Sequence, residues 1–63
     1  SPKDFSEHEL EEITEAYRLH VATFGKDEDN KFIIRLYNVY KLSVGEGFTL
    51  LNKTIKPRLQ FKL

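Results

Sequence analysis

The sequence lacks cysteine, methionine and tryptophan, and it holds only three glycines and two prolines in 63 residues. Without cysteine the chain forms neither a disulfide nor a thiolate metal site, so its cysteine content does not indicate in which cellular compartment it works. No segment approaches the roughly 20 apolar residues of a membrane helix, and no signal peptide is recognisable. We therefore expect a soluble protein of unknown localisation. The start at Ser1 rather than methionine is expected of an excised domain or an engineered sequence.

The length predicts one small domain spanning residues 1–63. A chain this short buries only roughly 60% of the surface that it exposes when unfolded, so its stability is marginal. The residues are 40% hydrophobic and 13% aromatic, which is enough for a small core and argues against disorder. Small domains without disulfides commonly depend on a metal or a partner for stability.

The two halves of the chain carry opposite charge. Residues 1–30 hold three basic and nine acidic side chains, and residues 31–63 hold seven basic and one acidic, which gives net charges of −6 and +6. Such asymmetry can mark a surface for nucleic acid or for an acidic partner. We favour the simpler interpretation that the halves pack together, because the field of a neutral molecule fades beyond a Debye length of about 8 Å.

The first half predicts one amphipathic helix over about residues 6–24. Ser6 and Glu9 match a capping box, in which each side chain bonds the backbone amide of the other residue. Apolar residues then recur at spacings of three and four, as on one face of a helix; they are Leu10, Ile13, Tyr17, Val21 and Phe24. Gly25 is expected to end the helix in a left-handed conformation.

The acidic stretch from Asp27 to Asp29 raises the question of a calcium loop. An EF-hand needs an oxygen ligand at position 5, glycine at position 6 and glutamate at position 12. Counted from Asp27, these positions hold Lys31, Phe32 and Asn38, so we reject calcium. The stretch is predicted to be a polar connection, where Asp and Asn suit the backbone.

The segment from residue 32 to residue 44 is rich in β-branched and aromatic residues, which favours a strand. The even positions from Phe32 to Val44 form an apolar face, broken by Asn38. A rival interpretation is a second helix. It rests on a polar stripe with helical spacing and on Gly45 as a cap; the stripe consists of Lys31, Arg35, Asn38 and Lys41. We prefer the strand on composition and on the sequence that follows.

That sequence predicts two more strands. Gly45-Glu46-Gly47 resembles a tight turn, and residues 48–55 would return beside the first strand. Pro57 cannot donate to a ladder and marks a break, after which residues 58–63 alternate between apolar and polar. The predicted fold class is α+β, in αβββ order. One N-terminal helix covers one face of a three-stranded antiparallel sheet with strands at about 32–44, 48–55 and 58–63.

One helix cannot cover both faces of a sheet, so the second face is the predicted partner-binding surface. Its apolar and basic residues are Ile33, Arg35, Tyr37, Val39, Lys41, Leu51, Lys53 and Ile55. An alternating strand at the C-terminal edge would also invite strand addition. We therefore expect a small non-enzymatic interaction module that binds a protein partner or itself. The alternative is a nucleic-acid-binding domain that uses the basic and aromatic residues of the sheet.

Catalysis and metal binding are not expected. The sequence has no phosphate-cradling glycine loop, no cluster with metal-ligand spacing and no nucleophile motif. His8 lies one helical turn from Glu11 and Glu12, but two such ligands are too few for a metal site. His20 lies at the edge of the apolar stripe, where a half-buried packing role is favoured over a general base. We expect no cofactor and no membrane partner, and the residues indicate no known family.

Overall fold

The structure is a computed structural model that describes the backbone of residues 4–62 and the side chains of residues 4–59. The predicted N-terminal helix is confirmed as α1 (Glu7–Phe24). The hydroxyl of Ser6 accepts from the Glu9 amide at 3.1 Å, and the Glu9 carboxylate accepts from the Ser6 amide at 2.9 Å. Gly25 ends the helix at φ 92° and ψ 161°, a positive-φ conformation outside the left-handed helical region. Its lack of a Cβ makes that φ accessible.

The prediction of a sheet is wrong, because residues 4–62 contain helices and no strand. Residues 29–40 form a second helix, α2 (Asp29–Tyr40), instead of the first part of a strand. Phe32, Ile33 and Leu36 are its buried residues, a helical spacing, whereas Ile34 of the supposed apolar strand face is 60% exposed. The rival interpretation of a second helix is therefore confirmed over residues 29–40, and Lys31, Arg35 and Asn38 of its polar stripe are exposed. The cap is Lys41, at φ 62°, rather than Gly45.

The second and third predicted strands are also wrong. Ser43 begins a helix that runs on without a break as α3 (Val44–Leu50), one π-helical turn η1 (Leu51–Ile55) and α4 (Lys56–Lys62). Leu63, the last residue of the third predicted strand, lies outside the described residues. The Ser43 hydroxyl accepts from the Glu46 amide at 3.2 Å, and the Glu46 carboxylate accepts from the Ser43 amide at 3.0 Å. This second capping box starts a helix where the glycines suggested a turn.

The π-turn lies directly before Pro57. A proline inside an α-helix cannot donate to the carbonyl four residues earlier, and its ring collides with that carbonyl. Here that carbonyl belongs to Lys53, inside η1. The amide of Lys56 bonds the carbonyl of Leu51, five residues back, so the turn is wider than an α-helical one. The wider turn lets the helix continue through Pro57, which the sequence had indicated as a break.

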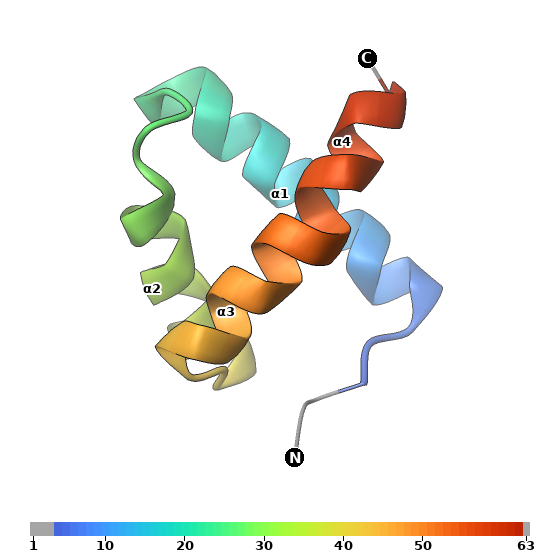
Figure 1. Cartoon of the computed structure of the whole chain (residues 1–63), viewed down its shortest axis with the longest axis vertical. Helices are drawn as coiled ribbons and strands as arrows, with labels where there is room; N and C mark the ends of the chain where they lie inside the picture. Colours follow the sequence, from blue (N-terminus) through green and yellow to red (C-terminus); the bar gives the residue numbers. More distant parts are fainter. Residues whose placement is uncertain (1–3, 63) are drawn as a thin grey trace.

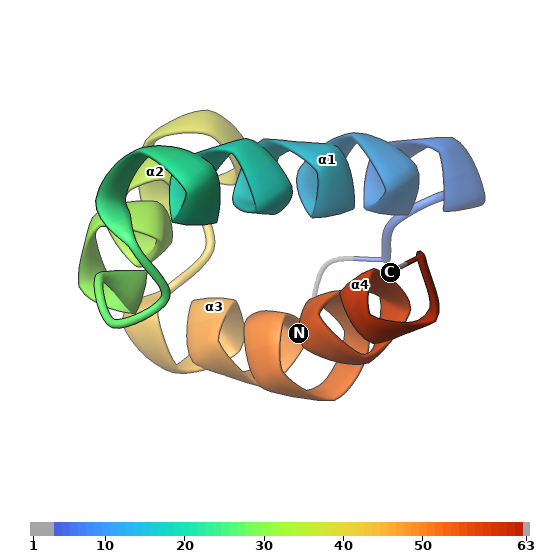
Figure 2. The ribbon, with the colours of Figure 1, turned by 90° about the horizontal axis from the view of Figure 1, so that it is seen from above.

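The long helix and α1 form two layers, and α2 closes one end between them (Figures 1 and 2). The α3 part of the long helix packs on α2, whereas η1 and α4 pack on α1. At the α2–α3 crossing, Gly47 is buried and lets the backbone of α3 approach Ile33. The buried hydrophobic core draws on every layer; it consists of Ile13, Tyr17, Phe32, Ile33, Leu36, Leu42, Leu51 and Ile55.

Candidate interaction surfaces and a buried polar network

The structure separates the eight residues that the sequence assigned to one binding face. Ile33, Leu51 and Ile55 are buried in the core. Three others, Arg35, Tyr37 and Val39, are exposed on α2, Lys41 is exposed at the C-cap of α2, and Lys53 is exposed on η1, in the long helix. Of the predicted surface, the part that is both exposed and continuous is therefore the outward side of α2.

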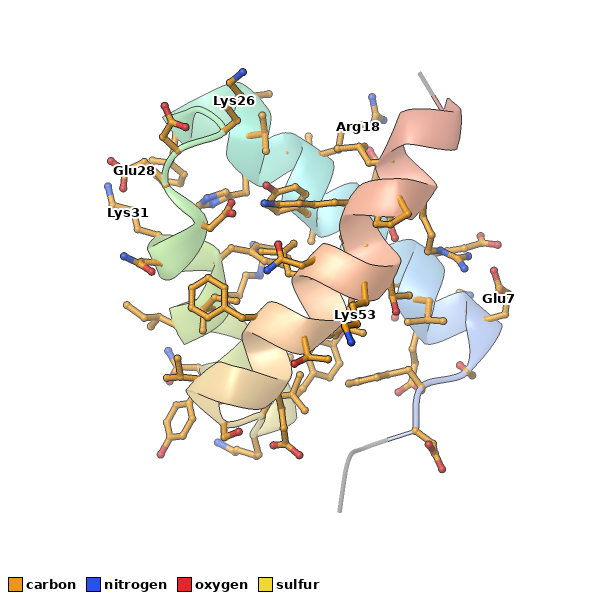
Figure 3. All side chains as sticks on the ribbon, viewed as in Figure 1. Glu7, Arg18, Lys26, Glu28, Lys31 and Lys53 are labelled. Atoms are coloured by element: carbon orange, nitrogen blue, oxygen red, sulfur yellow. The ribbon has the colours of Figure 1, made fainter. Side chains whose placement is uncertain are left out.

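The outward side of α2 is basic and apolar. Its large apolar side chains Ile34, Tyr37 and Val39 are 57–60% exposed. The Lys31 ammonium lies 4.8 Å from the centre of the Phe24 ring, a cation–π distance. Arg35 makes no ion pair with any described side chain. Figure 3 shows Lys31 projecting outward from α2.

A shallow groove of about 230 Å³ separates α1 from α2. Glu12 and Ala16 border it on α1, and Arg35 and Val39 border it on α2. Leu19, which is 61% exposed, follows Ala16 at helical spacing on the same side of α1. One acidic edge and one basic edge thus lie on neighbouring helices around a partly apolar floor. We call this surface the α1–α2 face.

A partly buried polar network joins α1, α2 and α4, and its Lys56 side chain is 39% exposed. The Tyr17 hydroxyl donates to Oδ1 of Asp29 at 2.8 Å, and the Lys56 ammonium lies 2.8 Å from Oδ2 of the same carboxylate. Tyr17 is 3% exposed, and the Asp29 side chain is 20% exposed. The sequence analysis missed this network, because its three members are far apart in the chain and none belongs to a motif.

The network shifts the pKa values of Tyr17 and Asp29. Burial raises the pKa of Tyr17, and its hydrogen bond to the Asp29 carboxylate, with the charge of that group, raises it further. Burial works to raise the pKa of Asp29, but hydrogen bonds from Lys56 and Tyr17 and the positive charge of Lys56 together lower it. Asp29 is therefore held as a carboxylate and Tyr17 as a neutral phenol, which suits a structural clamp better than proton transfer.

His20 is a packing residue, as the sequence analysis favoured. It is 7% exposed, and its ring lies 5.1–6.0 Å from the rings of Tyr17, Phe24 and Phe32. Nε2 lies 2.7 Å from the carbonyl oxygen of Glu28, which can only accept, so this nitrogen carries the hydrogen. The bond fastens the α1–α2 connection to α1.

His8 lies 3.5 Å from Glu12, and both side chains are exposed, at 82% and 58%. Such a surface pair contributes little to stability. Across the described residues, no three histidine, aspartate or glutamate side chains gather where they could hold a metal ion. No helix among those residues is long and apolar enough to span a membrane.

A second, larger groove shares no lining residue with the first. It has a volume of about 550 Å³ and is lined by Phe5, the α2–α3 connection and one side of α3 and η1. We call it the N-terminal groove. The sequence analysis did not anticipate it, because its walls come from segments that were assigned to a loop and to two strands.

Comparison with protein-family models, with curated proteins and with solved structures found no match for this chain.

Proposed function

We propose that the chain is a small non-enzymatic interaction module that associates with a second copy of itself through the α1–α2 face. The main support is that this one surface has an acidic and a basic edge, with Glu12 on α1 and Arg35 on α2. A two-fold dimer brings the same patch of both copies together, and when its axis runs along the groove a residue on one edge meets the partner's other edge. A patch with both signs is complementary to itself.

The apolar content of the face supplies the favourable burial. Leu19 and Val39 are 61% and 59% exposed, and Ala16 of α1 lines the groove between α1 and α2. A typical specific interface buries about 800 Å² on each partner. The total accessible surface is 4499 Å², so such an interface would take a large share of it and would add substantially to a small core.

The test is a charge swap followed by absolute mass measurement with light scattering across a dilution series. The unchanged protein is expected to move from monomer to dimer as its concentration rises. Arg35→Glu places acid against Glu12 of the other copy, and Glu12→Arg places base against Arg35, so each variant alone should associate about tenfold or more weakly. An equimolar mixture of the two should dimerise again, because both contacts are then between opposite charges.

The matched control is Lys26→Glu, which makes the same charge change in the exposed α1–α2 connection. It should associate like the unchanged protein. A monomer throughout the accessible concentration range would overturn the proposal. So would a mixture of Arg35→Glu and Glu12→Arg that remains monomeric while the unchanged protein dimerises.

Single-stranded nucleic acid is the second candidate, and one observation favours it. Lys31 and Arg35 are exposed on α2 together with Tyr37, which is 57% exposed, and Lys41 is exposed at the C-cap of the same helix. Cations that meet phosphates and an aromatic ring that stacks on a base are the usual elements of single-strand binding. Fluorescence anisotropy with a labelled single-stranded oligonucleotide at low salt tests it. Binding that Tyr37→Ala weakens supports this function, and no binding at low salt excludes it.

A further inference from the structure

We propose that the N-terminal groove binds a small amphipathic carboxylate, an acyl chain of medium length whose carboxylate meets Lys53. The site is separate from the α1–α2 face and does not depend on self-association. Its volume of about 550 Å³ falls within the range of about 300–1,000 Å³ that is usual for small-ligand sites. The apolar walls are Phe5, Leu42 and Leu50.

The groove runs along the long helix for about the length of a medium acyl chain. Gly45, Thr49 and Lys53 all line it at a spacing of four residues, so they follow one side of the helix. Eight residues from Gly45 to Lys53 correspond to a rise of about 12 Å. Gly45 leaves one end open, since a Cβ placed there would meet no atom within 4 Å.

The charge at the other end is a single ammonium group. Lys53 is exposed and makes no ion pair with any described side chain. Figure 3 shows it projecting from the long helix toward the side where the chain enters α1 near Glu7. A ligand whose chain lies along the groove can therefore place an anionic head group at Lys53 without competing with an acid of the protein for that cation.

Two hydroxyl groups of the groove are also unused. Thr49 and Thr54 line the groove, and neither hydroxyl makes a hydrogen bond with any residue that the structure describes. In contrast, the hydroxyls of Thr14 and Thr23 donate to carbonyls one turn earlier in α1, at 2.7 and 2.9 Å. Free hydroxyls beside Lys53 are donors that a bound carboxylate can accept from.

Glu46, the other charged residue of the groove, favours a ligand with one anionic group over a ligand with two. Glu46 lies toward the Gly45 end, and its carboxylate already accepts the backbone amide of Ser43. A second anionic group would meet this acid. Lys53 and Thr54 both belong to the π-turn η1, and π-turns occur frequently at functional sites.

The experiment is a titration of the isotope-labelled protein with decanoate, followed by amide chemical shifts in NMR spectra. Saturable shifts are expected in residues 45–54 and at Phe5. Lys53→Gln should weaken binding about tenfold, the size expected for one charge-assisted hydrogen bond. Decanol and decyltrimethylammonium carry the same chain without the anionic group, and both should bind more weakly than decanoate by a similar factor.

Gly45→Leu tests the groove itself, because a Cβ at this position meets no atom within 4 Å and the leucine side chain is expected to fill the open end. This variant should lose decanoate binding while melting no lower than the unchanged protein, since leucine favours a helix over glycine. Lys26→Gln is the matched control and should bind decanoate normally. Equal affinity for decanoate and decanol, undiminished binding by Gly45→Leu, or shifts confined to the α1–α2 face would each overturn the proposal.

Discussion

Two glycines of α3, Gly45 and Gly47, are expected to respond in opposite ways to the same substitution. Alanine favours a helix interior over glycine by about 0.8–1.0 kcal/mol, so each variant gains up to about 1 kcal/mol from helix propensity. At Gly45 a Cβ meets no atom within 4 Å. Gly45→Ala is therefore expected to raise the free energy of unfolding by up to about 1 kcal/mol.

At Gly47 the same methyl group meets the core. A Cβ there would lie 3.3 Å from both Cδ1 and Cγ2 of Ile33 and 3.8 Å from Cδ1 of Leu36. Carbon atoms pack best at about 3.5–4.0 Å, so Ile33 must move. Ile33 is 3% exposed and is surrounded by core residues. Overpacking of this kind costs about 1–3 kcal/mol, which should exceed the gain in propensity.

The difference between the two variants is the quantity to measure, because the propensity contribution largely cancels. Gly47→Ala should be less stable than Gly45→Ala by about 1–3 kcal/mol in urea unfolding followed by circular dichroism. For a domain of this size each kcal/mol corresponds to about 4–8 °C in Tm. Ile33→Val removes Cδ1, one of the two contacts, so it should cost less in the Gly47→Ala background than alone.

Equal stability of Gly45→Ala and Gly47→Ala would refute this reasoning. It would mean that Ile33 yields freely and that the close approach of α2 and α3 does not constrain position 47. Additive effects of Ile33→Val and Gly47→Ala would lead to the same conclusion.

Three further predictions follow from burial and charge. Ile13→Asp should abolish the cooperative thermal transition, because Ile13 is 2% exposed and a buried unpaired carboxylate is strongly unfavourable; a retained transition would contradict the assignment of the core. Tyr37→Glu should leave Tm within a few degrees, because Tyr37 is 57% exposed; unfolding would show that α2 is oriented differently. The lowered pKa of Asp29 adds stability that is present above the usual aspartate pKa of about 3.9 and is lost as the pH falls through its folded value. Asp29→Asn should therefore be less stable at pH 7 and lose less stability on acidification than the unchanged protein, and parallel urea profiles from pH 7 to pH 2 would exclude the contribution.

The sequence predicted α1 well because its signals agree. The capping box at Ser6, the apolar spacing and Gly25 all indicate one helix with the same boundaries. In the segment from residue 31 to residue 44, composition and periodicity disagreed. β-Branched residues favoured a strand, while the polar stripe of Lys31, Arg35 and Lys41 favoured a helix, and burial of Phe32 and Leu36 on one helical side decided it. Intrinsic strand propensity is weak beside tertiary packing.

The helix that begins after Ser43 could have been predicted from the sequence. Ser43 and Glu46 have the same spacing as Ser6 and Glu9, and the structure shows a capping box at both places. The glycines between and after them indicated a turn, although Gly47 serves close helix packing instead. The Tyr17–Asp29–Lys56 network and the N-terminal groove could not be predicted, because both depend on how three separate segments meet. The predicted binding face depended on an assumed register of strands, so it is wrong for a helical protein.

The π-turn before Pro57 constrains how many residues the long helix can contain. Regular α-helix turns about 100° per residue, so the four-residue spacing of Gly47, Leu51, Ile55 and Leu59 would rotate about 40° at each step. The wider turn at Leu51–Ile55 takes back part of that rotation. Deleting one residue from the α-helical part that precedes the π-turn, Val44–Leu50, would rotate α4 about the helix axis by about 100°, away from the partners of its two cations, the Lys56 contact with Asp29 and the Arg58 contact with Glu7. Insertions and deletions should therefore be tolerated in the connection at residues 25–28 but not in Val44–Leu50.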